Sequence, residues 1–199
     1  RVNFELANEW GNLVNRSISM AFKNCGEIPA AGELTDADRE LLDASAGGFD
    51  TVGDLLAHAK FKAAITEAMR IVGLANAYIS AQEPWKLKDN PERRNTVLHV
   101  ALQVVSDVNT MLTPFMPHSA QKIYEALGGE GVWAAQPELV ETDGAAPILM
   151  GDYASEKASW GRREIAVGTL LVKPSPIFRK LDAKLAETGP EWAPVNPQS

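Results

Sequence analysis

The sequence is poor in cysteine, in aromatic residues and in long apolar runs. Cys25 is the single cysteine in 199 residues, so the chain cannot close a disulfide within itself, and we expect a reducing compartment. No apolar stretch approaches the roughly 20 residues that a membrane-spanning helix needs, and the first residues lack a secretory pattern. We therefore expect a cytoplasmic protein with no membrane partner.

The sequence also lacks an excess of positive charge. Its formal net charge is −7, which argues against a surface that binds nucleic-acid phosphates everywhere. The charges are unevenly distributed, however. Residues 33–54 carry seven acids against one base, whereas residues 60–94 carry seven bases against four acids. A local anion-binding site therefore stays compatible with the overall charge.

The motifs of self-sufficient enzymes are absent. There is no P-loop, no dinucleotide-binding glycine fingerprint and no nucleophile elbow. The histidines His58, His99 and His118 have no carboxylate or thiol at metal-ligand spacing, and Cys25 has no nearby histidine. We therefore predict no catalytic residue, no metal and no cofactor in this chain.

The hydrophobic residues recur at three- and four-residue steps, which is typical of amphipathic helices. Gly47 and Gly48 are expected to stop the second helix, Pro84 ends the third, and Asn90 caps the fourth with Pro91 in its first turn. The expected helices cover residues 4–24, 35–46, 52 or 60 to 82, 91–112 and 118–127. The sequence thus predicts an all-α fold, an antiparallel bundle of about five helices over residues 1–129.

Residues 130–199 differ in character. Proline, glycine and acidic residues dominate up to about Tyr153, with little periodicity. We expect a loop-rich C-terminal extension as a second domain, with an extended segment at 165–172 and a short final helix at 178–186.

Two groups of residues suggest RNA binding. Asn12 and Arg16 lie four positions apart and share one face of a helix, where an amide and a guanidinium suit the edge of a base. Trp85 follows the helix-ending Pro84 and has lysines beside it, so its ring could stack on an unpaired base, worth about 1–3 kcal/mol. The alternative is that Trp85 packs into the bundle while Asn12 and Arg16 cap or salt-bridge a neighbour.

Four segments, in order over residues 1 to about 128, resemble the α-helical anticodon-binding domain of class I methionyl-tRNA synthetases. They are 7–16 (ANEWGNLVNR), 75–79 (ANAYI), 83–87 (EPWKL) and 111–120 (MLTPFMPHSA). A later stretch, 168–182 with PSPIFRKLD, is similar to the end of that enzyme's chain. The proline-tryptophan motif also occurs in related synthetases for other amino acids, but its combination with the GNLxxR helix is specific.

The resemblance implies that the bundle reads the CAU anticodon loop of methionine tRNA. By position, Trp85 would stack on the first anticodon base with Pro84 beside it, and Asn12 and Arg16 would hydrogen-bond to anticodon bases. The candidate phosphate contacts are the basic residues Arg70, Lys86, Lys88, Arg93 and Arg94.

The catalytic signatures of that family, a HIGH-type tetrapeptide and a KMSKS-type loop, are both missing. We therefore expect the C-terminal part of a longer enzyme, inactive by itself, whose partners are the tRNA and the catalytic domain of the same enzyme. That domain would join methionine to tRNA using ATP with Mg. Two alternatives stay open: the anticodon-binding domain of another class I synthetase, and a helical interaction module without an RNA role, in which Trp85 is buried.

Overall fold

The computed structural model describes residues 2–142, 145–151 and 153–178. A π-helix, Val2–Trp10, leads into the first α-helix, and a short 3-10 turn, Pro84–Lys86, links the third to the fourth. The α-helices are α1 (Gly11–Asn24), α2 (Asp36–Ala57), α3 (Phe61–Gln82), α4 (Pro91–Leu112) and α5 (Pro117–Ala126). The prediction of five helices is confirmed. Within the described residues, no helix is both long enough and apolar enough to cross a membrane.

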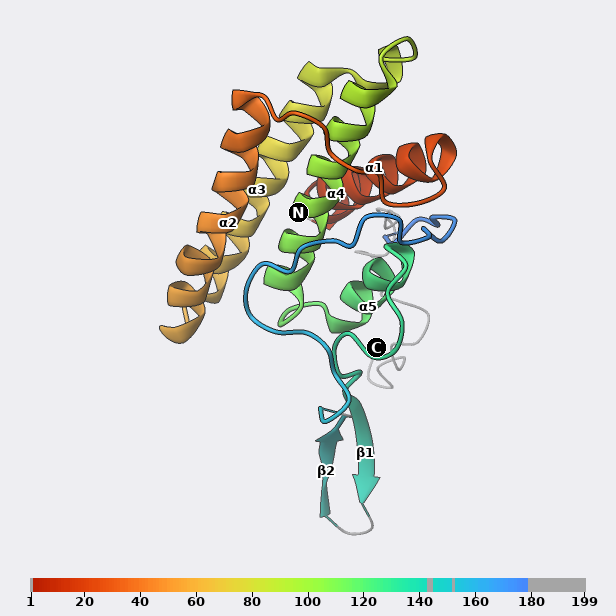
Figure 1. Cartoon of the computed structure of the whole chain (residues 1–199). Helices are drawn as coiled ribbons and strands as arrows, with labels where there is room; N and C mark the ends of the chain where they lie inside the picture. The colour runs from red at the N-terminus through yellow and green to blue at the C-terminus, as the bar shows by residue number, and fades with distance from the viewer. Residues whose placement is uncertain (1, 143–144, 152, 179–199) are drawn as a thin grey trace, which may run out of the picture.

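Helix α4 forms the centre of the bundle. It packs against α1, α2, α3 and α5, and Figure 1 shows α2 and α3 running alongside it, with α1 crossing behind and α5 near its far end. Its N-terminus is fixed as the sequence predicts, because the Asn90 side chain accepts a hydrogen bond from the Arg93 amide and Pro91 starts the helix. From Thr96 onward nearly every residue is buried.

Helix α2 is longer than the sequence suggested. The expectation that Gly47 and Gly48 stop it is wrong, since the helix continues to Ala57. Gly48 is buried, and a Cβ added there would lie 2.4 Å from Ile71 Cδ1 and 2.9 Å from Met111 Cε. The lack of a side chain at Gly48 therefore lets Ile71 of α3 and Met111 of α4 pack closely against α2, whereas a Cβ at Gly47 would meet nothing within 4 Å.

Helix α3 ends where the proline predicts. Glu83 adopts a left-handed conformation, with φ at 46°, and Pro84 opens the turn that follows. The start of the helix at Phe61 matches the later of the two predicted starting points. The end of α3, the turn and the start of α4 thus form a sharp corner.

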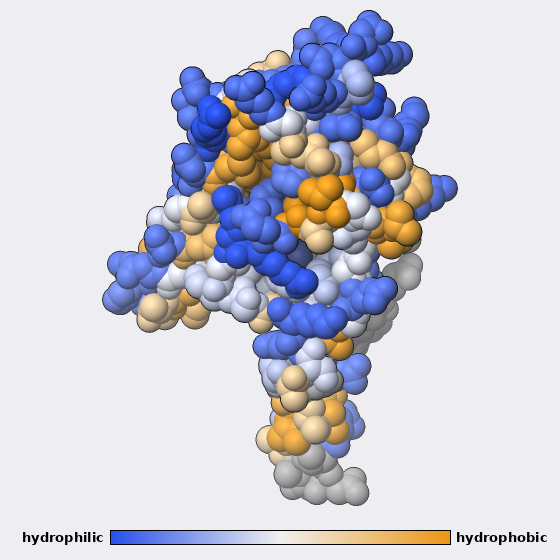
Figure 2. Space-filling model, viewed as in Figure 1, coloured by the Kyte–Doolittle hydropathy of each residue, from blue (hydrophilic) through white to orange (hydrophobic). Residues whose placement is uncertain are grey.

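The residues after α5 include a β-hairpin that the sequence reading did not predict. Strand β1 (Glu138–Thr142) pairs antiparallel with β2 (Ala145–Met150), with Leu139 opposite Leu149. The hairpin projects from the body of the molecule (Figure 1), and its surface shows apolar groups (Figure 2). The sheet cannot be read from the sequence because AAPILM lacks the alternation of a half-buried strand.

The rest of the C-terminal extension is coil where the structure describes it. Residues 165–172 were expected to be extended, and they form one isolated bridge, Leu170 with Glu27, rather than a strand. The predicted helix at 178–186 lies outside the described residues except for Phe178. The division into domains 1–129 and 130–199 stays a prediction.

Candidate nucleic-acid interface

Trp85 lies at the corner between α3 and α4 and projects from the surface. The left-handed Glu83 and the buried Pro84 turn the chain sharply before it, and 44% of the Trp85 residue is exposed. A helical interaction module without an RNA role predicts a buried Trp85. The exposed ring therefore argues against that alternative and leaves an aromatic surface for a ligand.

Arg16 reaches this tryptophan from a distant part of the chain. Its guanidinium carbon lies 5.4 Å from the centroid of the Trp85 ring, a cation–π contact between α1 and the corner. The structure thus brings together two residues that the sequence singled out separately. The guanidinium lies over the ring, and a fork of hydrogen-bond donors and a flat aromatic ring are both groups that bind unpaired bases.

Asn12 lies one helical turn before Arg16 on α1 and is exposed. It lines a pocket of about 440 Å³ together with Asn8, Asn15 and Phe178. Its side-chain amide makes no hydrogen bond to any other described residue. Within the described residues, the donor and the acceptor of this amide therefore have no hydrogen-bond partner.

Packing fixes the position of α1 relative to the corner. The chain entering the helix carries Trp10, which is 1% exposed, and Leu13 is fully buried. The Asn76 amide of α3 donates a hydrogen bond of 3.3 Å to the Glu9 carbonyl oxygen. The backbone that carries Arg16 is therefore held in place by the core, and the contact of its side chain with Trp85 adds to this.

Three of the candidate phosphate contacts are exposed. Lys86 forms an ion pair of 2.7 Å with Glu83, and Lys88 has no ion pair within the described residues. Both follow Trp85 within three residues. Arg70 is held by Glu67 on the same helix, whose hydrogen bonds raise the pKa of Arg70, and it lies about three turns before the corner.

The other two candidates are more enclosed. The Arg93 guanidinium pairs with the buried Asp38 and also donates to Gln82, so most of its donors are already used. The Nε atom of Arg94 is buried without a hydrogen-bond partner in the described part of the chain. Burial raises the pKa of the nearby Cys25 thiol, and the charge of Arg94 acts in the opposite direction.

The ion pair of Asp38 beneath the site was not predicted from the sequence. Burial on its own would raise the pKa of this carboxyl, but hydrogen bonds from Arg93, Tyr78 and Thr35 outweigh it and hold the pKa well below its ordinary value. Burial and the adjacent carboxylate raise the pKa of Tyr78. The available signal was Asp38 three residues after Thr35, which indicates a helix cap but not an ion pair.

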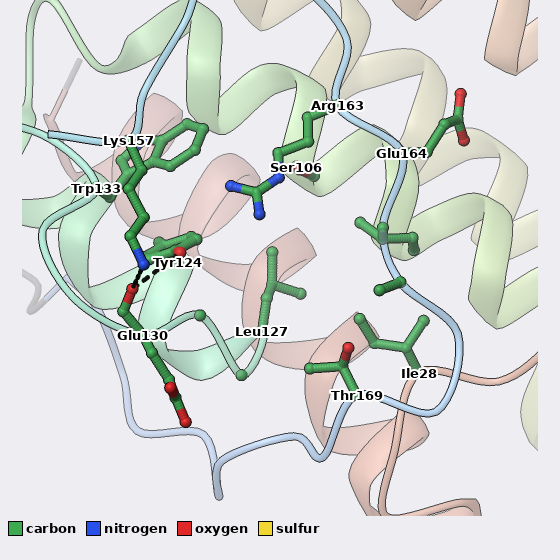
Figure 3. A pocket seen from close by; sticks show the side chains of 14 residues that line it. Ile28, Ser106, Tyr124, Leu127, Glu130, Trp133, Lys157, Arg163, Glu164 and Thr169 are labelled. Carbon is green, nitrogen blue, oxygen red and sulfur yellow. Dashed lines mark hydrogen bonds between the residues drawn. The ribbon is translucent and has the colours of Figure 1, made fainter.

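A separate cavity of about 330 Å³ lies between α5 and the loop at 157–169 (Figure 3). The Arg163 side chain points into it and lies 6.0 Å from the centre of the Tyr124 ring. Lys157 donates a hydrogen bond of 2.6 Å to the Glu130 carbonyl oxygen. None of the predicted RNA-binding residues lines this cavity, so it is distinct from the surface around Trp85.

Known proteins resemble this chain over nearly its whole length. The sequence profile described as the anticodon binding domain of methionyl tRNA ligase matches residues 28–143, more than half of the chain. The chain belongs to this family. It is 91% identical to the methionine–tRNA ligase of Cutibacterium acnes, covering 100% of this chain and 33% of that protein. It is 63% identical to the methionine–tRNA ligase of Saccharopolyspora erythraea, and the match covers 98% of this chain and 34% of that protein.

Solved structures show the same fold. The free state of Mycobacterium tuberculosis methionyl-tRNA synthetase matches with a TM-score of 0.74 and 30% identity, over 92% of this chain and 34% of that one. The same enzyme bound by methionyl-adenylate matches with a TM-score of 0.72 and 31% identity, over 90% and 32%. The chain spans about a third of the length of the relatives that it matches.

Proposed function

We propose that the surface formed by Asn12, Arg16 and Trp85, with the buried Pro84 fixing the turn beneath the ring, binds the CAU anticodon loop of methionine tRNA. The observation that supports this most strongly is the Arg16 guanidinium against the half-exposed Trp85 ring. Stacking on the ring would hold one unpaired base, and the Arg16 fork with the Asn12 amide would bond to base edges. The family match favours the methionine anticodon over the triplets that other synthetases read.

The negative net charge is compatible with this function. Recognition of an unstacked loop depends on stacking and on base-edge hydrogen bonds, with phosphate contacts in support. Lys86 and Lys88 are the best-placed phosphate contacts because they are exposed beside Trp85. Arg70 lies farther from the ring, and Arg93 and Arg94 have limited exposure.

The rest of the enzyme would supply the chemistry. The full-length relatives are named methionine–tRNA ligases, and we infer that a catalytic part, with ATP and Mg, joins methionine to the tRNA that this chain holds. In the complete enzyme, this chain would use the binding energy of its anticodon contacts to place the acceptor end of the tRNA in a productive position. By itself the chain would be inactive, and the complete enzyme would act in the cytoplasm.

Replacing the tryptophan tests the stacking role. Trp85→Ala should weaken binding of a CAU anticodon stem-loop by about 1–3 kcal/mol, or roughly 5- to 150-fold. Trp85→Phe keeps an aromatic face and should lose less. Unchanged affinity in a folded Trp85→Ala chain, measured by isothermal titration calorimetry, would refute the stacking role.

Replacing the arginine tests base readout. Arg16→Ala should reduce the preference for CAU over a loop with one altered base more than it weakens binding overall, because a base-edge contact carries sequence information. Lys23→Ala, at an exposed site near the end of the same helix, is the matched control and should alter neither. Equal losses on both loops in Arg16→Ala would show that Arg16 supplies charge and not selectivity.

A further inference from the structure

A buried ionic cluster lies directly beneath the corner that carries Trp85. Asp38 is fully buried, and its two carboxylate oxygens accept hydrogen bonds from both terminal nitrogens of Arg93, at 2.5 and 2.8 Å. The Tyr78 hydroxyl donates to the same carboxylate at 2.5 Å, and the Thr35 amide donates at 2.8 Å. The cluster is therefore a fully satisfied, charge-assisted network.

The cluster joins three helices at one end of the bundle. Asp38 belongs to the first turn of α2, Tyr78 to the last turns of α3, and Arg93 to the first turn of α4. Arg93 also donates a hydrogen bond of 2.7 Å to the Gln82 side chain. Gln82 is the last residue of α3 and lies three positions before Trp85.

The arginine fork thus reaches the chain on both sides of Trp85. One side is the end of α3, through Gln82, and the other is the start of α4, to which Arg93 belongs. Glu83, between them, holds a left-handed conformation that is unfavourable for a residue with a side chain. An enclosed network that fixes both ends of the corner would keep this conformation in place.

We propose that Asp38 and Arg93 are positioning residues, which set the orientation of the Trp85 ring without touching the RNA. This inference rests on the proposed function of Trp85. It replaces the expectation that Arg93 contacts a phosphate, because 18% of the Arg93 side chain is exposed and its terminal nitrogens already bond to Asp38 and Gln82. A phosphate contact and a positioning role predict different results for Arg93→Lys, because a lysine can still bind a phosphate but cannot reproduce the planar fork of an arginine.

The test uses the chain labelled with 5-fluorotryptophan, observed by ¹⁹F NMR, with the Trp85 signal assigned from Trp85→Phe. In Arg93→Lys, the Trp85 signal should shift or broaden while those of Trp10 and Trp133 stay in place. Affinity for the CAU stem-loop should fall at least about tenfold, because small displacements of a recognition group carry large penalties. Gln82→Ala keeps the buried ion pair and should produce a smaller change in the same direction.

The matched control is Arg39→Lys, which makes the same replacement at an exposed arginine of α2 paired with Asp36; it should change neither signal nor affinity. An Arg93→Lys chain with wild-type affinity and an unmoved Trp85 signal would overturn the proposal. If Arg93→Lys does not fold, which the Trp10 and Trp133 signals would reveal, an unmoved Trp85 signal in Gln82→Ala would overturn it. Failure of the wild-type chain to prefer CAU would instead reject the proposed function, while the NMR comparison would still decide the positioning role.

Discussion

The two adjacent glycines in the middle of α2 have different surroundings, and the same substitution should stabilise the chain at Gly47 but not at Gly48. Gly47 is exposed, and a Cβ there would meet nothing within 4 Å. Gly48 is buried against Ile71 and Met111, both of which are fully buried. Alanine at each position therefore changes the helix propensity equally but the packing only at Gly48.

The magnitudes follow from these surroundings. Gly47→Ala should raise the free energy of unfolding by about 0.5–1 kcal/mol, because alanine restricts the unfolded chain and favours helix. Gly48→Ala has the same favourable effect on the free energy of unfolding through helix propensity. Its Cβ would lie 2.4 Å from Ile71 Cδ1, however, so a buried side chain must move. Such overpacking costs about 1–3 kcal/mol. Ile71 Cδ1 and Met111 Cε are the ends of flexible side chains, which favours the lower part of this range, so the net change at Gly48 lies between about zero and a loss of about 2.5 kcal/mol.

The assay is urea unfolding of both variants beside the wild type, followed by circular dichroism, with the slope of the transition compared to confirm similar exposure of surface. The difference between the variants isolates the packing contribution, since the propensity effect cancels. Equal stability changes at Gly47 and Gly48 would contradict the close packing of α2 against α3 and α4.

Three further predictions concern the stability of the helical bundle. The pKa of Asp38 is lower in the folded chain than its unfolded value of about 3.9, so the ionised carboxylate contributes its full stabilisation above about pH 4 and loses it as the pH falls. Asp38→Asn should lower the free energy of unfolding by about 3–5 kcal/mol at pH 7. In urea titrations below about pH 4, the stability of this variant should depend less on pH than that of the wild type. Asn90→Ala removes the cap of α4 and should lower the unfolding free energy by about 1 kcal/mol, whereas no change would show that the cap is dispensable. Trp160 packs edge-on against Phe49 with ring centres 5.7 Å apart and donates to the Phe49 carbonyl oxygen, so Trp160→Ala should destabilise the chain by about 1–2 kcal/mol, and a wild-type melting temperature would contradict that packing role.

The parts of the fold that the sequence predicts well are those with strong local signals. Asn90 with Pro91 marks the start of α4, and Pro84 marks the end of α3, because capping and proline geometry act within a few residues. The error at Gly47 and Gly48 has a different origin. Whether a glycine ends a helix or admits a neighbouring helix depends on Ile71 and Met111, which are distant in sequence.

The same distinction applies to the site. The spacing of Asn12 and Arg16 on one helix is local information, and so is the position of Trp85 after a proline. The contact between Arg16 and Trp85 is not local, since it depends on how α1 packs against the rest of the bundle. Arg93 is a second example: its charge is evident from the sequence, but its ion-pair partner, Asp38, lies on another helix.

We expect this chain to read the bases of the methionine anticodon. The most direct measurement is titration of the chain with a CAU anticodon stem-loop and with loops altered at each anticodon base, at about 50 mM and about 200 mM salt. We expect a preference for CAU of at least about tenfold, or about 1.4 kcal/mol, that persists at the higher salt concentration. Equal affinity for all loops, or binding that disappears at the higher salt, would contradict base recognition by this surface.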